Sequence, residues 1–387
     1  MNAKTFMLIA GEASGDRLAA ELVTALRAAP QLRDDPWPAE FFGAGGPLMA
    51  RAGVKLAFDL TQHSVIGISE VAKKYFEFRR LFKVLLRLAI ESRPDVIIGV
   101  DYGGFNLRFA RAIKQHICKH RGEFNNWNPK IVQYVSPQVW ASRAGRAQLL
   151  AENHDLLLSI FPFEKDWYAQ HAPGLRVEFV GHRLAERREA RGAGREGSAA
   201  PLLLLPGSRA DELRRHLPVL LEALKLIRKA APNLAAKMVH PNDTMAIQAK
   251  AMGLPDGLQI QVGDLAGALA STDVAITKSG TVTLECAAAG VPAVVFYKTS
   301  WPTYFIGKRI ITVKYLAMPN LLADEELYPE FIQSKATPEN IAAAALELIR
   351  NEPRRQAIKA KLAKVIASLG AAGASERAAA AVLSLGK

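Results

Sequence analysis

Short apolar runs alternate with longer amphipathic segments along most of this 387-residue chain. Buried runs of this kind, separated by helices, are typical of parallel sheets that are covered by helices on both faces. The pattern therefore predicts an α/β fold with doubly wound parallel sheets. The predicted strands span residues 5–10, 40–42, 95–100, 130–135, 156–160, 177–180, 201–205, 236–240, 258–262, 273–276 and 293–296.

The chain is too long for one typical core, and its pattern breaks once near the middle. Residues 183–200 are rich in Arg, Glu, Gly and Ala, and they have no apolar periodicity after Leu184. We expect two α/β units with the cleft between them as the default ligand site. The predicted division is 1–183 for the first domain, 184–200 for a linker, 201–337 for the second domain and 338–387 for Ala-rich C-terminal helices.

Basic residues outnumber acidic ones by 50 to 37, which gives a formal net charge of +13. This excess favours an acidic partner, such as a phosphorylated small molecule, an anionic lipid or a nucleic acid. No motif for nucleic-acid binding is present, so we expect no such partner. We also expect no metal, because no group of residues has metal-ligand spacing. Scarce cysteines, and the lack of a signal peptide or a membrane-length apolar run, predict a cytoplasmic protein that contacts membranes only peripherally.

Two motifs in the first half follow predicted strands. GEASGD at 11–16 comes after the first strand, and Asp101 follows the strand at 95–100. Residues just past the carboxyl ends of parallel strands line the ligand crevice of such sheets. Asp101 is therefore a candidate general base, and GEASGD a candidate acceptor or phosphate loop. The alternatives are an N-cap for Asp101 and a tight turn for GEASGD.

Two motifs in the second half are placed in the same way. PGSR at 206–209 ends the first strand of this half, and Arg209 could bind phosphate oxygens. In SGTVTLE at 279–285, the backbone from Ser279 through Gly280 to Thr281 would present N–H groups and the positive end of a helix dipole to a phosphate. Glu285 lies on the same helical face as Thr281 and would accept hydrogen bonds from ribose hydroxyls. A solvated arginine and a plain capped turn are the alternatives.

Residues 71–92 have the pattern of a basic amphipathic helix. Apolar residues form one stripe, and the opposite side carries Phe76 among the cations Arg79, Arg80 and Lys83. One interpretation is a membrane-docking surface, together with an apolar loop that contains Val65, Ile66 and Ile68. The other is a core helix with a solvated charged face.

Taken in order, these motifs resemble the lipid-A-disaccharide synthase family over nearly the whole chain. The resemblance implies a glycosyltransferase-B architecture, with two Rossmann-like domains facing a cleft and a UDP-sugar held mainly by the C-terminal one. The segments that carry it are AGEASGD (10–16), FGAGG (42–46), GVD (99–101) with FN (105–106), VSPQVWA (135–141), FPFE (161–164), FVGH (179–182), LPGSR (205–209), residues 278–285 and MPNLL (318–322).

The implied reaction joins UDP-2,3-diacylglucosamine to 2,3-diacylglucosamine 1-phosphate (lipid X), and yields a β-1′,6-linked disaccharide 1-phosphate and UDP. Such enzymes are cytoplasmic and peripheral on the inner membrane. A homodimer that exchanges the C-terminal helices between subunits is one interpretation of the Ala-rich tail. The sequence departs from the family's usual pattern at Tyr102, Gly103, Gly104, Ser142 and Arg183.

The resemblance also implies roles for individual residues. Asp101 would deprotonate the 6-hydroxyl of the acceptor, and fixed donors would stabilise the departing UDP in place of a divalent metal, so no cofactor is expected. The UDP-sugar would be bound by Arg209, Ser279, Gly280, Thr281, Glu285, Met318 and Asn320. The acceptor side would be formed by Glu12, Ser14, Asp16 and Asn106.

Three other functions remain open at this stage. A transferase that acts on a polyprenyl-linked sugar, or a UDP-sugar epimerase, would use the same architecture. A non-catalytic nucleotide-binding protein at the membrane is the third alternative, although Asp101 and Arg209 favour an enzyme.

Overall fold

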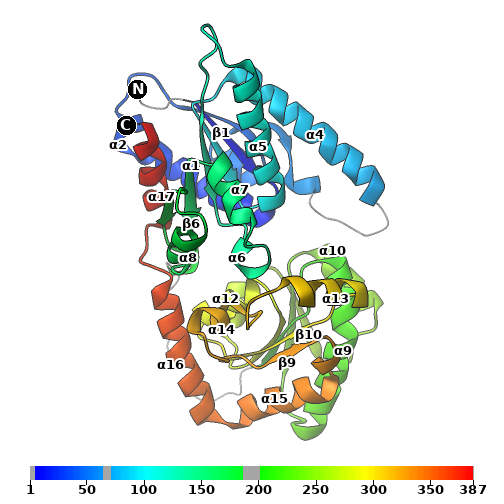
Figure 1. The fold of residues 1–387 in the computed structure, drawn as a ribbon. Coiled ribbons are helices and arrows are strands. Elements are labelled where there is room, and N and C mark those ends of the chain that lie inside the picture. Colours follow the sequence, from blue (N-terminus) through cyan, green and yellow to red (C-terminus); the bar gives the residue numbers. More distant parts are fainter. Residues whose placement is uncertain (1–4, 64–70, 186–200, 387) are drawn as a thin grey trace. The chain divides into compact units, whose positions relative to one another are not determined.

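The computed structural model describes residues 5–63, 71–185 and 201–386, which form two compact units. Unit 1 spans Met1–Arg183 and Gly370–Lys387, and unit 2 spans Leu184–Leu369. Of the predicted C-terminal helices, α15 (Pro338–Arg350) and α16 (Glu352–Ser368) therefore belong to unit 2, whereas α17 (Ala374–Leu383) belongs to unit 1 (Figure 1). Most of the predicted linker, residues 186–200, lies outside the described part, as do Val65, Ile66 and Ile68.

Unit 1 is built on a parallel sheet of seven described strands in the order β3-β2-β1-β4-β5-β6-β7. The order reverses between β1 and β4, which are hydrogen-bonded neighbours, so this is the topological switch point. The strands are β1 (Thr5–Ala10), β2 (Glu40–Gly45), β3 (Lys55–Asp59), β4 (Val96–Val100), β5 (Lys130–Tyr134), β6 (Leu156–Ser159) and β7 (Val177–Phe179).

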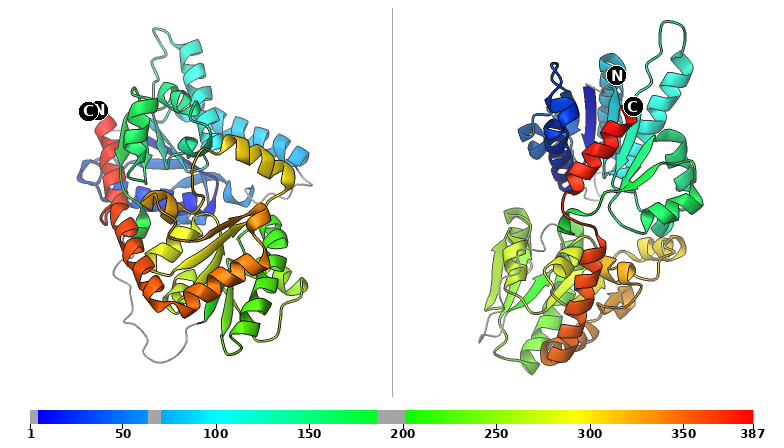
Figure 2. Two further views of the ribbon diagram at one scale, coloured as in Figure 1. Left: turned by 60° about the horizontal axis from the view of Figure 1, so that its bottom comes forward. Right: turned by 90° about the vertical axis from the view of Figure 1, so that its left-hand side faces the viewer.

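Alternate residues of the central strands anchor the core of unit 1. Met7 and Ile9 of β1 pack with Ile97 of β4 and with side chains of α4 (Val71–Ser92) and α5 (Gly103–His120). Helix α1 (Ala13–Ala28) lies alongside α17 (Figure 2). The other helices of the unit are α2 (Pro30–Arg33), α3 (Pro47–Arg51), α6 (Val139–Ser142), α7 (Arg146–Asn153) and α8 (Glu164–His171).

Unit 2 repeats this plan with a parallel sheet of six described strands, in the order β10-β9-β8-β11-β12-β13. Its switch point lies between β8 and β11, which are also paired. The strands are β8 (Leu202–Leu205), β9 (Ala236–His240), β10 (Leu258–Val262), β11 (Ala275–Lys278), β12 (Ala293–Tyr297) and β13 (Glu330–Ile332).

Helices flank the sheet of unit 2 (Figure 1). The longest, α9 (Ala210–Ala230), buries leucines at helical spacing and packs on α15. The others, besides α15 and α16, are α10 (Asp243–Ala251), α11 (Leu265–Ala270), α12 (Val282–Ala288), α13 (Trp301–Ile310) and α14 (Met318–Ala323).

The predicted α/β class with doubly wound parallel sheets is confirmed. The prediction missed two strands, β3 and β13, which each lie at the edge of a sheet. No residue of either strand is fully buried, so neither shows the continuous apolar run that marks the central strands. The predicted and observed bounds coincide for β1, β9 and β10.

Candidate active site

Asp101 lies directly after β4, where the carboxyl ends of β1 and β4 are neighbours. Asp101 and Tyr102 follow β4 with φ values of 52° and 46°, in the left-handed region that non-glycine residues rarely occupy. The carbonyl oxygen of Asp101 accepts hydrogen bonds from Asn106 Nδ2 at 2.8 Å and from Gln133 Nε2 at 3.0 Å. Both amides are buried, so they hold the strained turn in place from within the protein.

The loop after β1 and the first turn of α1 contact this turn from the other side. Ser14 Oγ donates a hydrogen bond to Asp101 Oδ2 at 3.2 Å, across the switch point. Gly11 must lack a side chain, because a Cβ there would lie 2.4 Å from the ring of Tyr102. Burial raises the pKa of the Tyr102 phenol, and the negative charge of Glu12 raises it further, so this carboxylate lies near the ring. The structure thus brings Ser14 and Asp101 together.

Asp16 has a structural role that the sequence did not predict. Its carboxylate is buried and accepts backbone hydrogen bonds from Gly46, Leu48 and Met49 at 2.8–3.0 Å. These N–H groups belong to the first turn of α3, whose own N-cap residue provides no side-chain acceptor. Asp16 therefore caps α3, and its carboxylate is already used. The side chain of Asn106, also expected on the acceptor side, donates to the Asp101 carbonyl.

A second buried carboxylate, from the FPFE motif and without an assigned role in the sequence, lies beside this region. Glu164 accepts hydrogen bonds from Trp140 Nε1 at 2.9 Å and from the Phe161 N–H at 3.2 Å. Burial raises the pKa of Glu164 to about 7, against the lowering effect of these donors. Trp140 lies in α6, directly after the loop that follows β5, and Pro137 of that loop lies where a Cβ on Gly103 would stand. Glu164 therefore anchors a loop that packs on the Asp101 turn.

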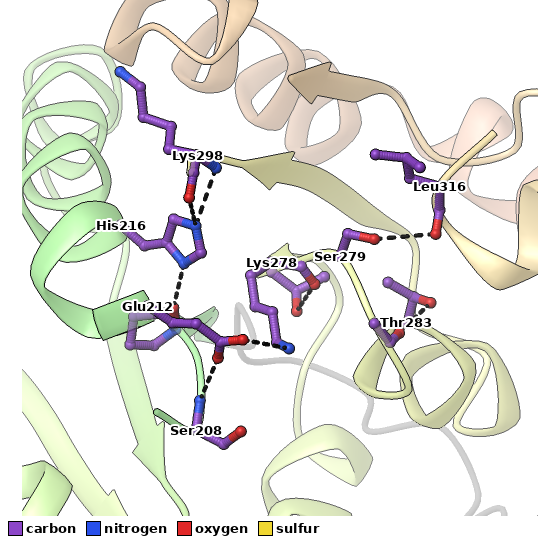
Figure 3. A network of polar contacts seen from close by, with 11 residues as sticks. Ser208, Glu212, His216, Lys278, Ser279, Thr283, Lys298 and Leu316 are labelled. Atoms are coloured by element: carbon purple, nitrogen blue, oxygen red, sulfur yellow. Dashed lines mark hydrogen bonds and ion pairs between the residues drawn. The ribbon is translucent and has the colours of Figure 1, made fainter. Parts of the chain in front are cut away.

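In unit 2, an ion pair joins the first turn of α9 to the end of β11. Lys278 Nζ lies 3.2 Å from Glu212 Oε1, and Glu212 Oε2 accepts the Ser208 N–H at 3.1 Å (Figure 3). Burial alone would raise the pKa of Glu212, but Lys278, the Ser208 N–H and Arg209 together bring it below its ordinary value. A charged Glu212 thus holds the loop after β8 and the end of β11 together at the switch point. Nothing in the sequence indicated this pair.

His216 also contacts the loop after β8. Its ring is buried, and Nδ1 donates to the Pro206 carbonyl at 2.9 Å while Nε2 accepts the Lys298 N–H at 3.1 Å (Figure 3). Burial lowers the pKa of His216, which fits a neutral ring with this arrangement. His216 therefore joins the end of β8 to the segment after β12.

The predicted diphosphate residues lie on these loops. Arg209 is the exposed N-cap residue of α9, and Thr281 is the N-cap residue of α12, with Gly280 before it at φ 131°. Glu285 is half-buried in the first turn of α12. Ser279 differs from the expectation, because its N–H donates to the Phe296 carbonyl and its hydroxyl to the Leu316 carbonyl. Its role in this structure is to tie β11 to the loop before α14.

Asn320 also has a structural role. It is fully buried, and its side chain donates to Tyr328 O and Glu330 Oε1 and accepts from the N–H groups of Leu327 and Tyr328. All of its hydrogen-bonding capacity therefore stabilises the loop between α14 and β13. Met318 is half-buried at the first position of α14, a helix that packs against α12.

The basic face of α4 is present as predicted. Phe76, Arg79, Arg80, Lys83, Val84 and Arg87 line one surface hollow of about 480 Å³. The opposite side of the helix enters the core through Leu85 and Ala89, with Phe82 packed beside them. Helix α4 thus packs on the core and also carries a basic, partly aromatic surface. No helix among the described residues is long and apolar enough to cross a membrane.

The two parallel sheets, each with loops gathered at its switch point, define a glycosyltransferase-B fold. Solved structures share it: the MnaA–UDP complex from S. aureus has a TM-score of 0.62 at 14% identity, covering 99% of this chain and 96% of that one. Acinetobacter baumannii MurG has a TM-score of 0.56 at 16% identity, covering 98% of this chain and 99% of that one. At this level of identity the likeness concerns the fold alone.

Sequence comparison identifies the family. The family model described as lipid-A-disaccharide synthetase matches residues 6–384. Curated lipid-A-disaccharide synthases are similar throughout: the protein from Alkalilimnicola ehrlichii is 36% identical, with 97% of each chain covered, and that from Geobacter metallireducens is 37% identical, with 99% of this chain and 97% of that one covered. The chain belongs to the lipid-A-disaccharide synthase family and is a glycosyltransferase, as its motifs predicted.

Proposed function

We propose that this enzyme transfers 2,3-diacylglucosamine from its UDP derivative to the 6-hydroxyl of lipid X, with Asp101 as the general base. The observation that carries the proposal is the strained turn at Asp101. A left-handed conformation costs on the order of 1–3 kcal/mol per residue and persists only where the surroundings enforce it. Two buried amides, Asn106 and Gln133, both donate to the carbonyl of this one residue.

The proposed reaction is a single inverting displacement. Asp101 accepts the proton of the 6-hydroxyl while that oxygen forms a bond to the anomeric carbon of the donor. The bond between the anomeric carbon and UDP breaks, and the electron pair leaves with the diphosphate. Because Ser14 donates to Oδ2, we assign Oδ1 as the oxygen that takes the proton. Inversion of an α-linked donor gives the β link of the product.

Unit 2 supplies the groups for the leaving diphosphate. We assign Arg209 to the phosphate oxygens, with the backbone at Gly280 and Thr281, and Glu285 to the ribose. The conformations of these loops support the assignment, because Gly207 and Gly280 both have positive φ and flank the Glu212–Lys278 pair. Donors that are fixed before the substrate arrives need no reorganisation as charge develops, and removing one such donor typically costs about 100-fold or more in rate.

The function is tested by incubating the purified protein with UDP-2,3-diacylglucosamine, with and without lipid X, and identifying products by mass spectrometry. We expect one disaccharide 1-phosphate and one UDP for each donor consumed, and no UDP release without lipid X. A UDP-sugar with altered stereochemistry, formed without lipid X, would instead identify an epimerase. Transfer to a polyprenyl-linked sugar but not to lipid X would identify the other transferase class.

We also infer that the enzyme works at the cytoplasmic surface of the inner membrane, with α4 as a docking element. Both proposed substrates carry acyl chains, so the site must receive them from a membrane or an equivalent interface. The hollow lined by Phe76, Arg79, Arg80 and Lys83 has the mixture of aromatic and cationic side chains that favours anionic lipid head groups.

A homodimer that exchanges α17 is a further part of this proposal. The segment before α17 contains Gly370 and Gly373, both with positive φ, which allows a sharp change of direction. Arg377 then ties α17 to unit 1 by a hydrogen bond to the Val180 carbonyl at 2.8 Å. In a dimer, the same contact would form with a second copy, and light scattering in solution would give the mass that decides between the two states.

A further inference from the structure

Helix α13 in unit 2 carries apolar side chains that this unit does not bury. None of its ten residues is buried. Trp301, Phe305 and Ile306 are 55%, 59% and 60% exposed, and Ile311 just after the helix is 41% exposed. The ring centroids of Trp301, Tyr304 and Phe305 lie 5.9 Å apart in every pair, so the aromatic residues form one group. Contiguous exposed apolar groups of this kind mark interaction surfaces.

The backbone that leads into α13 is held firmly. His216 accepts the Lys298 N–H, and buried Gln333 forms two hydrogen bonds of 3.1 Å with the N–H and carbonyl of Thr299. Ser300 then caps the helix by accepting the Thr303 N–H. Buried polar side chains therefore fix the start of a helix that has no fully buried residue of its own. The exposed apolar side chains of α13 therefore start from a backbone that is held in one position.

The chain segment that contains α13 carries only basic residues among its charged side chains. Residues 298–323 include Lys298, Lys308, Arg309 and Lys314 and contain no Asp or Glu. Lys308 and Arg309 are exposed in the last turn of the helix. A cavity of about 540 Å³ opens beside its first turn, and its lining includes Arg215, Lys298, Ser300 and Trp301. This volume lies within the usual range of small-ligand pockets, so it can admit a phosphate-bearing head group.

We propose that α13 binds the surface of an anionic phospholipid bilayer, as a second docking element in addition to α4. Trp301, Phe305 and Ile306 enter the boundary of the acyl chains, where aromatic residues are favoured. Lys308 and Arg309 contact the head groups, and one lipid phosphate lies in the cavity between Arg215 and Lys298. The inference extends the membrane part of the proposed function and assigns it a surface on unit 2.

The test compares three triple variants with the wild type by sedimentation with phosphatidylglycerol or phosphatidylcholine vesicles, without substrates. W301S/F305S/I306S removes the apolar group of α13. I247S/M252S/V262S is the matched control, because these residues are also exposed apolar side chains of unit 2. F76S/R79S/R80S tests α4 separately. Transferase activity on detergent-dispersed substrates shows whether each variant retains its fold and site.

We expect the α13 variant to partition onto phosphatidylglycerol vesicles about tenfold less than the wild type, with the control within about twofold. Both should keep their activity in detergent. Unchanged partitioning of the α13 variant would overturn the proposal, and loss in the α4 variant alone would then leave α4 as the docking element. Equal binding of the wild type to neutral vesicles would also overturn it. A variant that still binds vesicles but loses activity in detergent would show instead that α13 serves the acyl chains of a substrate.

Discussion

At the scale of single residues, the structure distinguishes candidate catalytic side chains from side chains that stabilise the backbone. Asp101, Ser14 and Asp16 all follow strands near the switch point of unit 1, and the sequence placed each of them in the site. Only Asp101 and Ser14 contact one another, while Asp16 caps α3. The sequence could not reveal this role, because the N–H groups that Asp16 satisfies lie about 30 residues further along the chain.

Gln133 is the converse case, because the sequence gives it no role in the site and the structure does. It lies within β5, in a run that predicts a strand and nothing more, yet its amide donates to the carbonyls of Asp101, Tyr134 and Val135. Its contribution arises from the pairing of β4 with β5, which brings residues 101 and 133 together. Gln133 is thus a positioning residue for Asp101, and it becomes visible only in the folded sheet.

We expect Gln133→Leu to lower kcat by about tenfold or more while changing KM by less than about threefold, because the Asp101 turn would relax while substrate contacts stay. Gln261→Leu is the matched control, since Gln261 also donates from a strand to the carbonyls of a following turn, at Gly263 and Asp264, but in unit 2. Steady-state kinetics on both variants checks this. An unchanged kcat in Gln133→Leu would remove its positioning role.

At the scale of secondary-structure elements, the loop after β5 depends on a single buried carboxylate. Glu164 at the start of α8 receives the indole N–H of Trp140, and the Ser136 hydroxyl hydrogen-bonds to Tyr168 on the same helix. These contacts join α8 to a loop with two left-handed residues, Val135 and Gln138. The motifs VSPQVWA and FPFE were singled out in the sequence, and the structure accounts for them as two halves of one contact.

This contact predicts a pH dependence of stability. The folded-state pKa of Glu164 is about 7, above the ordinary value of 4.5, so the folded protein binds the proton more tightly than the unfolded chain. The contribution of this group to the free energy of unfolding is therefore largest below pH 4.5 and is lost as the pH rises through 7. The loss amounts to about 3 kcal/mol.

Glu164→Gln removes this titration, because the amide keeps an acceptor for Trp140 and carries no charge. We expect the difference in unfolding free energy between the variant and the wild type to shift in favour of the variant between pH 5 and pH 8. Buried His154 and His182, whose pKa values are lowered to about 4, change the stability of both proteins equally and cancel in the comparison. Denaturant titrations at several pH values measure the difference, and a constant difference would contradict the assignment.

At the scale of the whole molecule, the two units share the same strand pairing and carry their candidate residues at the same place in the sheet. In each, the first strand pairs with the fourth, and the loops after this pair carry the candidate residues: Ser14 and Asp101 in unit 1, and Arg209 and Thr281 in unit 2. The sequence predicted this organisation well, because motif positions after strands depend on the apolar pattern. It did not predict β3, β13 or the return of α17 to unit 1, which depend on edge packing and on tertiary contacts.

The proposed mechanism depends most on Asp101 acting as a base rather than as a structural turn residue. The most direct test measures turnover and UDP affinity for Asp101→Asn beside Asp95→Asn, a control in which the altered aspartate precedes the opposite end of the same strand. We predict that Asp101→Asn loses turnover by about 100-fold or more while UDP affinity stays within about twofold, and that Asp95→Asn keeps both. Turnover of Asp101→Asn equal to that of the Asp95 control would contradict the account.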